Sequence, residues 1–355
     1  MTMKNTLLFL LFLVGISACQ DKNKAGLTSN LKVFASVEID TLLEKEISIR
    51  ALLLDDTKIW YAGNNGQYGS IDLIKNKKFN GHITKDTLLP EFRSIAQTKE
   101  NIFMLNVGTP ALLYKVSKDG SHIKNVYLEN HPKAFYDSMQ FWNDTEGIAM
   151  GDPINNCFSV LITRDGGNTW NKIPCENLPK TIEGEAAFAA SNTNLVIKGN
   201  NTWMVSGGKK ARIFFSADKG KSWRVTETPI IQGETMTGIF TADFYDAQNG
   251  FIAGGNYEKL NQNFGNKAVT TDGGKTWRLK AEKEGFGYAS CIQYVPNSNA
   301  EQLVSVGASG LYYSANAGEK WTKFSDDTSL FTIRFMNDST AIAAGKNKII
   351  RIKFK

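Results

Sequence analysis

The chain has 355 residues, of which 42% are hydrophobic and 21% are charged, so its composition excludes a disordered protein and supplies enough apolar side chains for a core. Its formal net charge of +6 is spread among 35 acidic residues instead of gathered in runs, which argues against a nucleic-acid-binding surface. The 31 glycines indicate a fold with many turns.

The N-terminal residues have the pattern of a secretory signal peptide. Lys4 precedes an apolar run at 7–14, and small residues follow up to Cys19. The string ISAC at 16–19 resembles the lipobox of bacterial lipoproteins, in which the cysteine sulfur is acylated; an ordinary cleaved signal is the alternative. We predict a signal peptide at 1–18 and a lipidated Cys19 followed by a polar tether up to residue 30.

This N-terminal pattern also predicts where the protein acts. We expect it in the cell envelope, lipid-anchored on the periplasmic face of the outer membrane or at the cell surface. Since no later stretch has the roughly 18 apolar residues of a spanning helix, we expect contact with the membrane through the lipid alone.

One short motif recurs along the rest of the chain. Its Asp, or the equivalent Asn, falls at positions 119, 165, 218, 272 and 316, which are 46, 53, 54 and 44 residues apart. Such a period indicates propeller blades or solenoid coils. The copies are SKDG at 117–120, TRDGGNTW at 163–170, SADKGKSW at 216–223, TTDGGKTW at 270–277 and SANAGEKW at 314–321.

Each residue of the motif has a physical role in a β-hairpin. The Asp accepts backbone N–H groups in the turn, Gly provides positive φ, and Trp buries a large ring as the next strand begins. We therefore predict a structural role, with no metal bound. The residues in these roles are Asp165, Trp170, Asp218, Trp223, Asp272, Trp277, Asn316 and Trp321.

A second repeat sets the register of the units. FWNDTEGIAMG at 141–151 recurs as FYDAQNGFIAG at 244–254 and as FMNDSTAIAAG at 335–345, which predicts an inner hairpin. The two hairpins give four strands per unit and seven unit starts. We expect an all-β, seven-bladed propeller over residues 31–355, whose incomplete last blade is closed by the N-terminal strand at 31–39.

Three cysteines remain after Cys19, so at least one of them is unpaired. Cys157 and Cys175 are equally far from Gly166, the centre of a predicted hairpin, and are placed to form a disulfide; buried free thiols are the alternative. The chain has no C-x-x-C motif, and its three histidines lack metal-ligand spacing. We expect no metal and no cofactor.

Residues 135–223 carry the resemblance to a known family. The strings FYDSMQFWNDTEGIAMGDP, GEAAFAASN and SADKGKSW resemble the photosystem II assembly-factor-like propellers of bacteria, which carry the Asp-box, or bacterial neuraminidase repeat. The likeness extends over about residues 45–355. It implies a seven-bladed propeller with the box away from the ligand and, in photosynthetic members, a factor that binds partner proteins. For this chain no photosystem partner is implied.

Enzymes with Asp-boxes are the alternative. A sialidase needs three arginines for a carboxylate, a Tyr nucleophile with a Glu partner, and an acid/base Asp. This chain has eight arginines and no F/Y-R-I-P string. A glycan-binding protein or sialidase-like glycoside hydrolase stays open as the alternative. An oxidoreductase, a label carried by some bacterial relatives, is less favoured because no cofactor motif occurs.

Polar residues near the predicted axial opening form the candidate site. Charged residues in or beside inner strands need partners or water, so they either line the channel as a satisfied network or recognise a peptide or glycan. We predict a non-catalytic propeller that binds a protein or peptide partner and no nucleic acid. The candidate residues are Arg50, Arg93, Tyr136, Asp137, Asp152, Glu185 and Arg334.

Overall fold

Apolar and β-branched runs separated by turns rich in glycine and asparagine fold into antiparallel strands over residues 31–355, the part of the chain that this computed structural model describes. The predicted signal peptide at 1–18, the lipid site Cys19 and the tether up to residue 30 lie outside the described residues. Residues 33–355 form one unit. Within them the single helical element is a 3-10 turn, Cys175–Asn177. No helix of the described part is long and apolar enough to cross a membrane.

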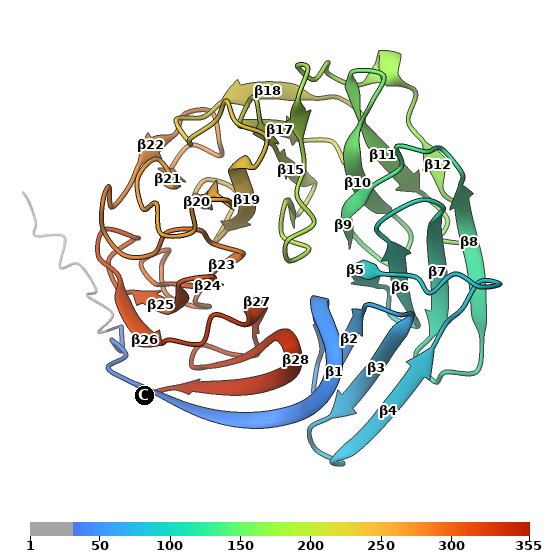
Figure 1. Cartoon of the computed structure of the whole chain (residues 1–355), viewed down its shortest axis with the longest axis horizontal. Coiled ribbons are helices and arrows are strands. Elements are labelled where there is room, and N and C mark those ends of the chain that lie inside the picture. Colours follow the sequence, from blue (N-terminus) through green and yellow to red (C-terminus); the bar gives the residue numbers. More distant parts are fainter. Residues whose placement is uncertain (1–30) are drawn as a thin grey trace, which may run out of the picture. The chain divides into compact units, whose positions relative to one another are not determined.

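The strands form six antiparallel sheets around a common centre (Figure 1). Four sheets have four strands each. The first consists of β5 (Phe92–Gln97), β6 (Asn101–Asn106), β7 (Ala111–Ser117) and β8 (Ile123–Glu129), and the second of β9 (Tyr136–Phe141), β10 (Gly147–Ile154), β11 (Cys157–Thr163) and β12 (Asn171–Lys172). The third consists of β14 (Leu195–Lys198), β15 (Asn201–Val205), β17 (Arg212–Ser216) and β18 (Arg224–Glu227), and the fourth of β23 (Cys291–Tyr294), β24 (Leu303–Gly307), β25 (Gly310–Ser314) and β26 (Thr322–Ser325).

Two sheets have six strands. One, in spatial order, consists of β27 (Leu330–Phe335), β28 (Thr340–Phe354), β1 (Val37–Asp55), β2 (Lys58–Gly63), β3 (Gln67–Asp72) and β4 (Lys77–His82). The other consists of β13 (Glu185–Ala186), β16 (Gly207–Gly208), β19 (Thr237–Phe244), β20 (Gly250–Asn256), β21 (Lys267–Thr270) and β22 (Arg278–Leu279).

The all-β propeller is confirmed, but the predicted number of seven blades is wrong, because the described strands form six sheets. The cause is β1, one continuous strand of 19 residues. Its first half pairs with β28, with Val37 opposite Phe354, and its second half pairs with β2 up to Asp55 opposite Lys58. The last and first predicted blades are thus joined in one sheet. The strand that joins the chain ends begins at Val37, later than the predicted Leu31.

Neighbouring sheets pack through hydrophobic clusters between their faces. An aromatic side chain from the second strand of one blade often covers the box glycine of the following blade. A Cβ at Gly167, whose φ is +74°, would lie 2.2 Å from the Phe103 ring. At another interface the Trp203 indole N–H donates to the carbonyl of Gly273 at 3.0 Å. Residues of the Asp-boxes therefore pack between neighbouring sheets.

The Asp-box carboxylates are used within their own turns. Asp272 accepts the backbone N–H groups of Lys275 at 2.9 Å and Thr276 at 3.0 Å, and the hydroxyl of Thr270 at 2.7 Å. Burial raises the pKa of Asp272, but the hydrogen bonds led by those of Thr276 outweigh it and lower the pKa to about 2. These contacts match the structural role that the motif predicts.

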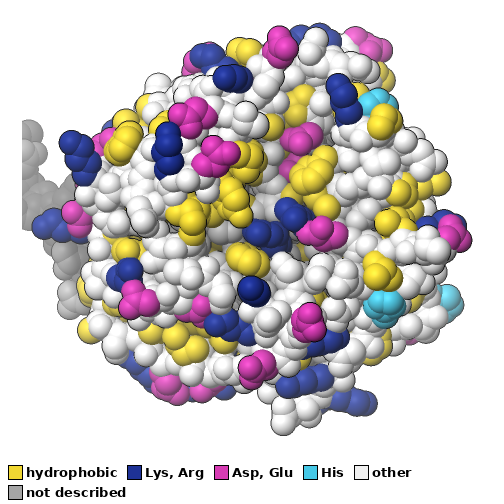
Figure 2. All heavy atoms as spheres, viewed as in Figure 1, with side chains coloured by type: hydrophobic (Ala, Val, Ile, Leu, Met, Phe, Trp, Pro, Cys, Tyr) yellow, Lys and Arg dark blue, Asp and Glu magenta, His cyan; other side chains and the backbone are white. Residues whose placement is uncertain are grey.

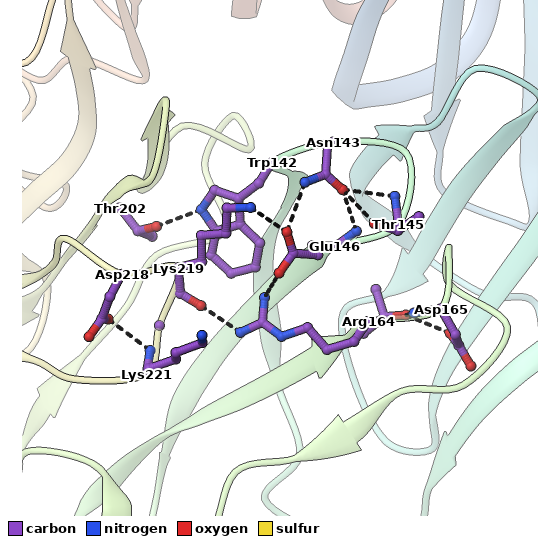
Figure 3. A network of polar contacts seen from close by, with 12 residues as sticks. Trp142, Asn143, Thr145, Glu146, Arg164, Asp165, Thr202, Asp218, Lys219 and Lys221 are labelled. Atoms are coloured by element: carbon purple, nitrogen blue, oxygen red, sulfur yellow. Dashed lines mark hydrogen bonds and ion pairs between the residues drawn. The ribbon is translucent and has the colours of Figure 1, made fainter.

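Ion pairs also tie one blade to the next box (Figure 3). Arg164 pairs with Glu146 at 3.0 Å and donates to the carbonyl of Lys219 at 2.7 Å, while the Lys219 ammonium group pairs with Glu146. Trp142 lies beside this network, with the Arg164 guanidinium 5.1 Å from its ring centroid and its N–H bonded to Thr202 at 2.9 Å. The charges of Glu146, Arg164 and Lys219 are thus paired with one another at this interface.

Cys157 and Cys175 form a disulfide in the structure, with their Cα atoms 5.7 Å apart. The bridge joins the start of β11 to the 3-10 turn. Cys291 is buried with a free thiol.

Candidate axial binding site

Five inner strands carry a one-residue β-bulge at the same place, where the strand register shifts by one. A bulge leaves its extra residue unpaired in the ladder and turns that side chain in a new direction. A buried alanine, serine or threonine follows each extra residue. The five extra residues are Arg50, Arg93, Asp137, Phe240 and Phe331.

The segment 187–194, here called the axial plug, runs through the centre of the ring. Asn192 accepts the N–H of Met139 on β9 at 3.0 Å and donates to the carbonyl of Ile95 on β5 at 2.9 Å. Other residues of the axial plug bond to β1, β19 and β27. Since these strands belong to sheets on different sides of the ring, the axial plug closes the channel. In Figure 1 the yellow-green chain between β12 and β15 reaches towards the middle.

A pocket of about 400 Å³, here called the axial pocket, has the axial plug as its floor. Arg50 donates to the plug carbonyl of Ala190 at 2.9 Å, and its guanidinium lies 4.1 Å from the Phe331 ring centroid. Arg93 and Asp152 also line the pocket. Figure 2 shows charged and hydrophobic side chains together around the middle of one face.

Four aromatic rings form a wall of the axial pocket, and one of them, Phe188, belongs to the axial plug. Phe188 and Phe240 stack with centroids 3.9 Å apart and an interplanar angle of 7°. Tyr288 meets Phe240 edge-on at 4.8 Å, and Tyr257 meets Tyr288 edge-on at 5.1 Å. Such contacts hold the rings in fixed positions. The pocket therefore combines a rigid apolar wall with two guanidinium groups.

Burial shifts the pKa of two charged groups that line this pocket, Arg50 and Asp152. Burial lowers the pKa of Arg50, and nearby Arg93 lowers it further. Arg93 is paired with Glu91 at 2.7 Å at the rim. Asp152 accepts the N–H of Ala187 at 2.8 Å, and burial raises its pKa to about 6.

Asp137 is the least expected member of the site. It is fully buried, and neither carboxyl oxygen has a hydrogen-bond partner among the described residues. Burial raises the pKa of Asp137 well above its usual value, the charge of Asp152 raises it further, and Arg93 opposes this. Burial therefore favours the neutral form of Asp137, and the charged groups that line the pocket are Arg50, Arg93 and Asp152.

The structure places the other three candidate residues elsewhere. Tyr136 donates to Glu129 at 2.7 Å between two sheets. Glu185 is fully buried in an ion pair with Arg212, away from the axial pocket. Arg334 contacts the plug from its other side and lines a second pocket, of about 620 Å³, at the opposite ends of the inner strands. Arg50, Arg93, Asp137 and Asp152 are thus the four predicted residues that the structure brings together.

The aromatic wall is the part of the site that the sequence interpretation missed. A signal for one of its members exists: an apolar residue, the bulge residue and a small residue recur as a triplet at five inner strands. Aligning these triplets would have placed Phe240 beside Arg50 and Arg93. The triplets are Ile49-Arg50-Ala51, Phe92-Arg93-Ser94, Tyr136-Asp137-Ser138, Ile239-Phe240-Thr241 and Leu330-Phe331-Thr332.

Known proteins resemble this chain mainly in fold. The family model described as BNR/Asp-box repeat matches residues 268–279. No curated protein sequence matches the chain. The structure of YCF48 bound to D1 peptide has a TM-score of 0.65 and 13% identity, over 91% of this chain and 98% of that one. YCF48 from Cyanidioschyzon merolae has a TM-score of 0.62 and 12% identity, over 90% and 98%.

A structure that is named for an enzyme is similar to the same degree. The streptogramin B lyase structure has a TM-score of 0.66 and 13% identity, over 91% of this chain and 100% of that one. At such identities the likeness establishes the fold alone. The Asp-box match at 268–279 adds the repeat type. The chain is an all-β propeller that carries a BNR/Asp-box repeat at residues 268–279.

Proposed function

We propose that the chain is a non-catalytic binding propeller that holds a peptide segment of a protein partner in the axial pocket. The observation that carries this proposal is the convergence of Arg50 and Arg93 with a wall of four packed aromatic rings. Guanidinium groups bind carboxylates and backbone carbonyls, and the rings bind apolar side chains. A peptide offers all three groups within a short length.

The likeness to YCF48 supports this proposal. That protein has the same fold and was solved with a D1 peptide bound, so this type of propeller can take a peptide. The pocket of this chain differs from a sialidase site in its composition. It is lined by two arginines and no glutamate, whereas that reaction needs three arginines and a Tyr-Glu pair.

Photo-cross-linking at the pocket wall tests the proposal. Tyr257, which lines the pocket and is 46% exposed, is replaced by p-benzoylphenylalanine. The purified protein is irradiated with a detergent extract of the cell envelope, and the adducts are mapped by mass spectrometry. We expect one peptide segment of one partner to be captured, and Arg93→Gln to reduce its yield roughly tenfold, since a charge-assisted contact is lost.

Two matched controls complete this experiment. The same cross-linker at Leu128, which is 51% exposed on the outer strand β8, reports capture outside the axis. Arg278→Gln removes an exposed arginine on β22 and should leave the adduct unchanged. Identical adducts from positions 257 and 128, or equal loss in the two arginine variants, would contradict peptide binding in the pocket.

We further propose that the protein acts on a lipid tether in the cell envelope. The signal-like residues 1–18 and the string ISAC at 16–19 support this. Mass spectrometry of the N-terminal peptide from cells tests it: a diacylglycerol adduct on Cys19 is expected, and an unmodified Cys19 or an intact leader would refute it.

A further inference from the structure

A cleft lies at the outer rim of the ring, between β2–β4 and the turn after β7. Its volume is about 350 Å³, and we call it the lysine cleft. Figure 2 shows dark-blue side chains at the lower rim, where Figure 1 draws β4. The lysines that line the cleft are Lys58, Lys75, Lys77, Lys78 and Lys118.

The lysine cleft exists because one Asp-box is shortened. At an intact interface, Trp203 donates its indole N–H to the box carbonyl of Gly273. Trp60 is in the corresponding second strand, but the box that it faces, around Gly120, lacks the terminal Trp. Trp60 is 2% exposed, and its N–H has no hydrogen-bond partner among the described residues. The missing ring leaves a hollow beside Trp60, whose indole N–H is buried and does not open into it.

The charge of the lysine cleft is positive. Four lysines, at positions 58, 75, 77 and 78, make no side-chain hydrogen bond or ion pair with any residue in 31–355, while Lys118 pairs with Asp55 at 2.7 Å. The two carboxylates that line the cleft are used elsewhere. Backbone N–H groups of the following turn, led by that of Lys75, lower the pKa of Asp72, and hydrogen bonds led by that of Ser117 lower the pKa of Asp119. Four ammonium groups are therefore available for a ligand.

The cleft also offers an aromatic surface. The hydrophobic side chain of Phe79 lines the cleft and is 39% exposed to solvent. The Lys58 ammonium group lies 5.2 Å from the Trp60 ring centroid, so cation and aromatic surface are adjacent. A sugar ring presents C–H groups to an aromatic face and, if acidic, a carboxylate to ammonium groups.

We propose that the lysine cleft binds an acidic saccharide, a ligand class separate from the peptide proposed for the axial pocket. The uronate or sulfate groups contact the lysines at 75, 77 and 78, and a ring packs on Phe79. The hollow shape of the cleft favours a ligand that enters it over a flat lipid surface. The volume of about 350 Å³ suits one or two sugar rings.

Calorimetric titration with trigalacturonic acid tests this proposal, with maltotriose as a neutral probe. The triple variant Lys75→Gln, Lys77→Gln, Lys78→Gln should weaken binding of trigalacturonic acid roughly tenfold or more, since three charges are removed. Phe79→Ala removes the exposed aromatic ring and should weaken binding roughly fivefold. Maltotriose should bind far more weakly than trigalacturonic acid.

A matched variant uses exposed lysines at three intact Asp-boxes. Lys221→Gln, Lys275→Gln, Lys320→Gln removes the same charge and should leave the affinity within about twofold, because interactions between separated surface charges are screened. Thermal unfolding of every variant distinguishes lost binding from lost folding. The axial pocket is untouched, so peptide cross-linking at Tyr257 should persist in all of them.

Four outcomes would overturn the acidic-saccharide site. They are no heat from trigalacturonic acid, equal weakening in the two triple variants, equal affinity for maltotriose, and equal affinity for inorganic sulfate alone. Binding to vesicles of equal parts phosphatidylglycerol and phosphatidylcholine is measured as a further comparison. Tighter binding to these vesicles than to trigalacturonic acid, lost in the lysine-cleft variant, would show a membrane-docking surface instead.

Discussion

At the scale of single residues, burial raises the pKa of two carboxyl groups at the axis, Asp137 and Asp152, so we expect stability to depend on pH. The Asp152 carboxylate accepts a hydrogen bond from one backbone N–H, whereas the Asp137 carboxylate has no hydrogen-bond partner among the described residues. Burial therefore disfavours the charged form of both groups. A buried carboxyl without an ion pair reduces stability at neutral pH. Such groups often mark functional sites, because the fold alone does not need them.

Replacement of Asp152 by Asn makes this dependence measurable. The pKa of Asp152 rises from 3.8 to about 6 on folding, so between these values the native state binds more protons than the unfolded state. Stability from this group is therefore greatest below about pH 4 and falls as the pH rises through about 6. We expect Asp152→Asn, which retains an acceptor for Ala187, to be more stable than the wild type at pH 8 by about 3 kcal/mol.

Urea unfolding at a series of pH values checks this expectation. The difference between Asp152→Asn and the wild type should shrink as the pH falls from 8 to 4. Asp338→Asn changes the same charge at an exposed position and should show no such trend. A pH-independent difference for position 152 would mean that its carboxyl titrates normally.

At the scale of elements, the axial plug and the bulges together form the pocket. Each bulge sends one side chain towards the axis, and the small residue that follows leaves space for it. The plug then fills the channel and bonds to inner strands of several sheets. A β-propeller without this segment would have an open channel in place of a pocket floor.

Among the residues of the axial plug, replacement of Asn192 should reduce the stability of the protein most. Its side chain joins β9 to β5 through two hydrogen bonds, and Asn192→Ala leaves a buried N–H of Met139 and a buried carbonyl of Ile95 unpaired. We expect a loss of about 2–4 kcal/mol in the free energy of unfolding, measured by urea denaturation. Asn130→Ala, at an exposed position, should change it by less than about 0.5 kcal/mol. Equal effects of the two substitutions would refute a structural role of the plug.

At the scale of the whole molecule, the sheet in which β1 pairs with β28 closes the ring of blades. The pairing of β1 with β28 is reinforced by Arg351 with Asp40 at 2.8 Å and Lys353 with Glu38 at 3.1 Å. Exposed pairs of this kind contribute little. The buried side chains of β28, such as Ile352, contribute most of the closure.

Ile352→Ala should therefore destabilise the entire ring. Ile352 is fully buried opposite Ile39, so we expect a loss of about 3 kcal/mol in the free energy of unfolding. Because the sheet joins both ends, circular dichroism and tryptophan fluorescence should report one common transition. Ile74→Ala, where the side chain is 76% exposed, is the control. A separate early transition in Ile352→Ala would mean that the ends unravel independently of the other blades.

Part of this architecture was predictable because it is local. An Asp-box closes its turn within eight consecutive residues, so Asp165, Asp218 and Asp272 could be assigned from the sequence. The same holds for Arg50 and Arg93, whose inner strands follow from the repeat register. Both arginines line one pocket because they occupy equivalent positions near the start of their blades.

The sequence by itself determined the all-β fold, the box hairpins and several charged residues of the axis, since these follow from short repeated patterns. Tertiary structure decided the number of sheets, because the pairing of β1 with β28 joins residues about 300 positions apart. It also decided the aromatic wall, which segments from different sheets build, and the lysine cleft, which appears where the neighbouring box lacks its Trp. Such features depend on which side chains face one another across a sheet interface, and no local pattern encodes that.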